Sequence, residues 1–134
     1  MLKRFIRNEK GLTLIELLAV IVILGIIAAI AIPSIGGLIE NSRKDAHIAN
    51  AQQMVNAARL AYTADSTKTE YTLKYLEEKK YLEPVKKPGG GEYDKEASKA
   101  VLVNGTWVVT LVSGNKTHFA DKDPGTLKRD DVEL

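Results

Sequence analysis

Residues 10–33 read KGLTLIELLAVIVILGIIAAIAIP, and this stretch decides the fold of the chain. From residue 12 to residue 32 the sequence is apolar except for Thr13, Glu16 and Gly25. A helix of that length extends for about 30 Å, which is roughly the thickness of the hydrocarbon core of a bilayer. The stretch therefore predicts a membrane-spanning helix near the N-terminus.

The charge of the chain is concentrated in the eleven residues before this span. The net charge of the whole chain is +2, whereas these residues alone carry +3, from Lys3, Arg4, Arg7 and Lys10 against Glu9. The sequence pI of about 8.8 is therefore no argument for nucleic-acid binding. Basic residues beside an apolar span stay on the cytoplasmic side, which predicts an N-in, C-out orientation.

The helical pattern continues well beyond the apolar span, to about Ala64. Pro33 and the pair Gly36-Gly37 are its only breakers, and after them one face stays apolar at three- and four-residue steps: Ile48, Ala51, Val55, Ala58 and Tyr62. A helix of some fifty residues is about 80 Å long. A small domain cannot bury such a rod, so its apolar first half must contact lipid or other copies of the chain.

The remaining residues predict a small antiparallel sheet. Residues 65–71 and the run around Lys87-Pro88-Gly89 are typical of loops, and residues 72–80 of a short helix. Three strands are expected at residues 100–103, 106–112 and 117–120, joined by Asn104-Gly105 and Gly114-Asn115. Trp107 and its alternate neighbours should face the core. From Asp121 on we expect a loosely held charged tail.

The predicted fold class is α+β, with a long N-terminal helix packed on a three-stranded antiparallel sheet. The expected domain organisation is a basic leader at 1–11, an apolar helix at 12–33 that spans the membrane or forms the filament core, and a globular head at 34–134. The head contains the amphipathic second half of the helix, the loop with its short helix, the strands and the tail.

The segment from Lys10 to Leu18 resembles the prepilin-type cleavage and methylation motif of type IV pilins and related pseudopilins. A basic leader ends in Gly11, an apolar Leu12 follows, and Thr13 and Glu16 stand at the matching positions. Pro33 also falls where these proteins commonly have a proline. Most members have Phe where this chain has Leu12. The resemblance is specific from residue 10 to residue 33 and is looser, at the level of architecture, over the rest.

The resemblance implies cleavage between Gly11 and Leu12 by a membrane-embedded prepilin peptidase, followed by N-methylation of the new Leu12 amine. Glu16 is then a carboxylate one helical turn from a cationic amine, inside an otherwise apolar helix. We expect Glu16, with Thr13, to set the register of subunit assembly. Pro33 has no N–H to donate to the Ala29 carbonyl, so a bend is expected there, with Gly25 as a second weak point.

Two simpler interpretations of the span stay open. A cleavable secretory signal is one, since Ala29-Ile30-Ala31 mimics a small-x-small cleavage site, although the span is longer than the usual apolar region of such signals. A plain single-pass anchor for an extracytoplasmic binding module that never polymerises is the other. The anchor leaves Gly11, Glu16 and the long rod unexplained.

The sequence shows no catalytic constellation, so we expect neither an enzyme nor a cofactor. His47 and His118 have no ligands at metal spacing and are interpreted as solvated surface residues. Some secretion pseudopilins hold calcium in a C-terminal loop, but the acidic residues around Gly125 do not have EF-hand spacing and favour a solvated tail: Asp121, Asp123, Asp130 and Asp131. No metal site is therefore expected.

The implied partners are other copies of the chain, the membrane, the prepilin peptidase, and an assembly platform with its cytoplasmic ATPase. Nucleic acid is not expected as a direct partner. The expected function is that of a type IV pilin-like subunit of a surface pilus for adhesion or motility. The alternative is a pseudopilin of a secretion or DNA-uptake machine. The chain has no cysteine, whereas many pilins and the members in competence systems carry a cysteine pair.

Overall fold

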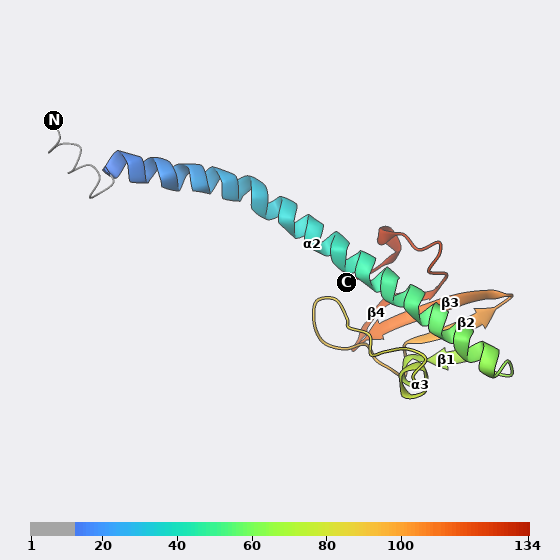
Figure 1. Cartoon of the computed structure of the whole chain (residues 1–134). Helices are drawn as coiled ribbons and strands as arrows, with labels where there is room; N and C mark the ends of the chain where they lie inside the picture. The colour runs from blue at the N-terminus through green and yellow to red at the C-terminus, as the bar shows by residue number, and fades with distance from the viewer. Residues whose placement is uncertain (1–12) are drawn as a thin grey trace. The chain divides into compact units, whose positions relative to one another are not determined.

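The computed structural model describes residues 13–134. They form one long helix, a four-stranded sheet and two short helices (Figure 1). By its internal contacts the chain divides into two compact units that meet between Ile39 and Glu40. The long helix α2, Leu14–Ala64, begins in the first unit and ends in the second, and the two units are described separately below.

The second unit holds the hydrophobic core. Helix α2 contributes small and medium side chains to it, among them Ala51, Met54 and Ala58, each 0% exposed. These lie on the face expected from the three- and four-residue spacing. The helix ends at Ala64, and the Asp65 side chain accepts a hydrogen bond from the Thr67 amide in a local turn. Such Asx turns compete with helix continuation and so help to end the helix.

The sheet has the order β1-β2-β3-β4, and all its strand pairs are antiparallel. The strands are β1 (Glu70–Thr72), β2 (Lys99–Val103), β3 (Thr106–Ser113) and β4 (Lys116–Lys122). Asn104 and Gly105 both have positive φ, 50° and 81°, as a two-residue type I′ hairpin turn requires. In β3, Trp107, Val109 and Leu111 are buried at alternate positions, which confirms that this face lies in the core.

The prediction of three strands was wrong, because β1 is a fourth strand. Its residues pair with β2 in the register Glu70↔Val101, Tyr71↔Ala100 and Thr72↔Lys99. Three residues are too few to show a clear alternation, and the partner strand lies far along the chain, so the sequence carries no local sign of β1. Thr72 also caps helix α3 (Leu73–Glu78), with its hydroxyl accepting from the Tyr75 amide at 3.1 Å.

The C-terminal segment, residues 123–134, is held in place rather than loose, which corrects the expected tail. It contains the short 3-10 helix η1 (Arg129–Asp131) and the buried side chain of Val132. Arg129 makes a two-pronged ion pair with Asp45 of α2, at 2.8 and 2.7 Å. The backbone amide of Glu133 donates to the His118 carbonyl of β4 at 2.9 Å. These contacts come from residues far away in the sequence, so charge content alone gave the wrong expectation.

Candidate assembly site

The first turn of α2 is closed by reciprocal hydrogen bonds between Thr13 and Glu16. The Glu16 amide donates to the Thr13 hydroxyl, and the Thr13 amide donates to Oε2 of Glu16, both at 3.2 Å. The Thr13 carbonyl accepts the first intrahelical bond, from the Leu17 amide, at 3.0 Å. This arrangement is a capping box, and it satisfies two amides that a helix start otherwise leaves unpaired.

The capping box gives Glu16 a local role that our sequence interpretation missed. Its signal is present in the sequence, because Thr-x-x-Glu before an apolar run is the signature of such a cap. The hydrogen bond to the Thr13 amide uses Oε2, and Oε1 has no hydrogen-bond partner within residues 13–134. The cap therefore leaves one carboxylate oxygen, and the negative charge, to interact with a cation.

The apolar side chains of the first unit have no cover within the part of the chain that the structure describes. From Leu14 to Ile39 the large ones are 45–83% exposed. An 18-residue window of α2 near the N-terminus has a mean hydropathy of 3.0, so by length and composition the helix can cross a membrane. Exposed apolar surface on this scale marks contact with lipid or protein.

Pro33 lies inside α2, which continues through it. Its missing N–H leaves the Ala29 carbonyl without the usual donor. One residue later, the Ser34 hydroxyl donates to the Ile30 carbonyl at 3.3 Å, a bond that often accompanies helix bending. A Cβ placed on Gly25 would meet no other atom within 4 Å, so no close packing inside the chain requires glycine there. The expected bend at these positions stays a prediction.

Among the predicted site residues from residue 13 onward, the structure brings Thr13 and Glu16 into contact. Gly25 and Pro33 lie further along the same helix. Gly11 and Leu12, the expected cleavage and methylation positions, lie outside the described residues. The peptidase cut, the methylation and the register role of Glu16 therefore stay predictions.

In the second unit, His47 and His118 are buried, which corrects their interpretation as solvated surface residues. They are 1% and 3% exposed, and their rings stack with centroids 4.1 Å apart. Burial lowers the pKa of His47 to about 4 and lowers the pKa of His118 as well. Neither histidine showed this environment in the sequence, because each ring is covered by segments remote from it along the chain.

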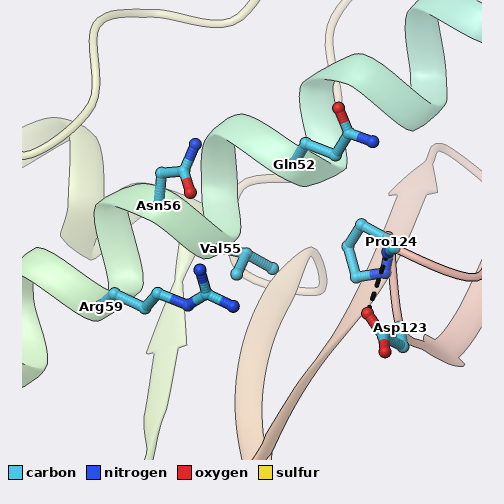
Figure 2. A pocket seen from close by; sticks show the side chains of 7 residues that line it. Gln52, Val55, Asn56, Arg59, Asp123 and Pro124 are labelled. Carbon is cyan, nitrogen blue, oxygen red and sulfur yellow. Dashed lines mark hydrogen bonds between the residues drawn. The ribbon is translucent and has the colours of Figure 1, made fainter.

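A polar pocket of about 270 Å³ opens on the second unit. Figure 2 shows the residues that line it: Gln52, Val55, Asn56 and Arg59 on helix α2, and Asp123 and Pro124 on the other side. The Asp123 carboxylate accepts from the Gly125 amide at 2.9 Å, which fixes the turn that forms one wall. The pocket offers one guanidinium, one carboxylate and two amides, so it suits polar groups rather than an apolar ligand.

Residues 13–134 contain no cluster of three or more His, Asp or Glu side chains that could hold a metal ion. Two of the four acidic residues considered for calcium accept from backbone amides. Asp123 stabilises its own turn, and the Asp131 carboxylate accepts from the Lys128 amide at 3.0 Å to cap η1.

Comparison with known proteins gives one finding. Residues 6–32 match the family model described as the prokaryotic N-terminal methylation motif. No curated protein and no solved structure matches the chain significantly. The motif implies processing by a prepilin peptidase and assembly into pilus-type polymers in general. Together with the exposed apolar helix, it fits a membrane-anchored precursor. The chain therefore carries the type IV prepilin-like signal motif, which supports a precursor of the type IV pilin or pseudopilin kind.

Proposed function

We propose that this chain is a structural subunit that is processed, methylated and polymerised into an extracytoplasmic filament. The observation that carries the proposal is the uncovered apolar surface of α2 from Leu14 to Ile39, most of which lies within the methylation motif at residues 6–32. In the precursor, lipid covers this surface. In the filament, the apolar surfaces of neighbouring subunits cover one another. The same helix therefore serves in the precursor and in the filament.

Glu16 determines how the helices pack against one another in the filament. Cleavage between Gly11 and Leu12 creates a cationic amine next to the capped first turn. The Glu16 carboxylate, whose Oε1 has no hydrogen-bond partner within residues 13–134, then neutralises that amine, in its own subunit or in an adjacent one. Pairing between subunits allows one stagger of the helices, because any other stagger leaves a charge unpaired in apolar surroundings.

The second unit forms the surface of the filament and has no enzymatic role in this proposal. It encloses a hydrophobic core of its own. A membrane-embedded peptidase processes the leader, and an inner platform with a cytoplasmic ATPase drives polymerisation. The basic leader keeps the N-terminus inside and places the second unit outside.

Mass spectrometry of the mature N-terminus tests the processing step. A chain that begins at methylated Leu12 supports the proposal, whereas an intact Met1 contradicts it. A chain that begins after Ala31 contradicts it as well, and supports a secretory signal instead. The matched control is Gly11→Val, which changes the residue before the cut. This variant should stay uncleaved, and the cells that make it should have no filaments.

The finer assignment, a surface pilus for adhesion or motility, has its own test. Electron micrographs of cells with and without the gene should show long surface filaments that disappear on deletion. Short filaments confined to the periplasm or the wall would assign the chain to a secretion or uptake machine. Membrane localisation without any polymer would leave it as an anchored binding module.

A further inference from the structure

Two buried imidazoles join three segments of the second unit that are remote in sequence. His47 lies on α2, His118 on β4, and the stacked rings are tilted by 28° to each other. Tyr93, from the loop before β2, meets the two rings edge-on. The C-terminal segment supplies the Glu133 carbonyl, which accepts from Nδ1 of His118. The pair is thus a junction between the helix, the sheet edge and the end of the chain.

The hydrogen bonds suit the neutral form of both rings. A carbonyl oxygen only accepts, so Nδ1 of His118 carries a proton, and Nε2 accepts from the Ser113 hydroxyl at 2.7 Å. The Tyr93 oxygen accepts from the Asn50 amide at 3.0 Å. Its own proton then points to Nδ1 of His47 at 2.7 Å, which makes that nitrogen an acceptor. A second proton on His47 competes with the Tyr93 hydroxyl for the same contact, and a second proton on His118 requires the Ser113 hydroxyl to turn from donor to acceptor.

The charges that face the pair also disfavour protonation. The positive charge of Lys87 lowers the pKa of both rings, and that of Lys116 lowers the pKa of His118. Burial raises the pKa of Tyr93 to about 12, so its phenol stays neutral and offers no compensating charge. The nearby Asp45 is already paired with Arg129. Glu133 supplies its backbone carbonyl, and this hydrogen bond only partly opposes the effect of burial on His118.

The C-terminal segment depends on this neutral pair. His118 holds it twice, through Nδ1 to the Glu133 carbonyl and through its own carbonyl to the Glu133 amide. Val132, beside these bonds, is 2% exposed. Glu133 contacts the His118 ring, so lifting residues 132–133 would let water reach a charged His118.

We propose that the His47–His118 stack is an acid-sensitive latch, and that protonation of the pair releases the C-terminal residues 128–134 from β4 and α2. The latch lies entirely within the second unit and does not rest on the proposed filament function. The closed form is fully favoured above the ordinary histidine pKa of 6.5, and it weakens as the pH falls toward 4. If opening returns His47 alone to its ordinary pKa, the open-to-closed ratio rises about thirtyfold from pH 8 to pH 5.

Nuclear magnetic resonance of the full, ¹⁵N-labelled chain in detergent micelles tests this latch between pH 8 and pH 4.5. At pH 8 the His118 ring should show a proton on Nδ1 and none on Nε2. On acidification the amides of Val132 and Glu133 should lose their native positions together with imidazole protonation, while Val109 and Leu111 keep theirs. Rings that gain a proton with no change in the Val132 and Glu133 amides would overturn the proposal, as would amides that stay native down to pH 4.5.

Matched variants show whether protonation of the histidines or of carboxylates releases the C-terminal segment. Glutamine can donate to the Glu133 carbonyl and accept from Ser113 but cannot titrate, so His118→Gln should keep the segment closed and flatten its pH dependence. His47→Gln should do the same through Tyr93. Asp45→Asn removes the ion pair with Arg129 and should raise opening by a similar factor at every pH. An unchanged pH dependence in both glutamine variants would assign the release to carboxylates and refute the latch.

Discussion

A matched pair of substitutions at the start of α2 can separate the role of the Glu16 charge from the role of the Thr13–Glu16 helix cap. Glu16→Gln keeps the capping box, because Gln is also a capping-box residue, but it removes the negative charge. Thr13→Ala keeps the charge but removes the hydroxyl that accepts from the Glu16 amide. If the charge sets the register of assembly, the first variant should fail to assemble and the second should not.

The expected magnitudes differ enough to be distinguished. Loss of an N-cap hydroxyl costs about 1 kcal/mol, which is roughly fivefold in an equilibrium constant. A charge left unpaired in an apolar environment costs about 3 kcal/mol, which is more than a hundredfold. Thr13→Ala should therefore form filaments at somewhat reduced yield, whereas Glu16→Gln should fall below detection.

The assay compares filament yield with processing in the same cells. Filaments are sheared and pelleted, and the subunit is quantified against the membrane-bound pool. Mass spectrometry of the N-terminus confirms that each variant is cleaved and methylated, so that a processing defect is not mistaken for an assembly defect. Circular dichroism of the purified chain in micelles reports whether the helix start is retained.

Two results would refute the reasoning. If processed Glu16→Gln assembled as well as wild type, the carboxylate would act only as a helix cap. If Thr13→Ala lost filaments as completely as Glu16→Gln while keeping its charge, the geometry of the first turn would matter more than the charge.

Three further predictions concern the stability of the second unit, each measured by urea unfolding in micelles with Trp107 fluorescence as the signal. The folded state keeps His47 neutral, because its pKa is lowered from 6.5 to about 4. The free energy of unfolding should therefore be highest above pH 6.5 and should fall by about 2 kcal/mol between pH 8 and pH 5. A flat pH profile would contradict the burial of this ring. Leu76→Ala removes a fully buried side chain and should cost about 2–5 kcal/mol, whereas the exposed Leu60→Ala should change little. Gly105→Ala places a Cβ at φ 81° and should cost about 1 kcal/mol; no loss would mean that the hairpin turn adopts another conformation.

The parts of the fold that the sequence predicted are those with local signals. The long helix follows from an apolar and then alanine-rich pattern that only Pro33 and Gly36-Gly37 interrupt, and the β2–β3 hairpin follows from Asn104-Gly105. The alternation around Trp107 correctly indicated the core face of β3. In each case the residues that determine the structure lie within a few positions of one another, so pattern and conformation correspond.

The parts that were missed depend on remote partners. Arg129 fixes the C-terminal segment through Asp45, which lies 84 positions away in the sequence. Strand β1 exists because β2 pairs with it, and His47 is buried because His118 and Tyr93 cover it. No periodicity within a segment records such contacts. At the candidate assembly site, the Thr-x-x-Glu spacing of the Thr13–Glu16 cap is present in the sequence. We interpreted Glu16 through its charge instead, as a residue that pairs with an amine.

Glu16 should dominate the register of assembly because the rest of the first unit is almost entirely apolar. Glu16 is the only ionisable residue from Thr13 to Ile39. Exchanging lipid for neighbouring helices changes the hydrophobic free energy little, since lipid tails are as apolar as Leu and Ile side chains. Van der Waals packing of an almost uniformly aliphatic surface distinguishes poorly between one stagger and the next. The polar group is then the feature whose energy depends most steeply on register, so the precision of assembly should depend on Glu16 far more than on any one of its apolar neighbours.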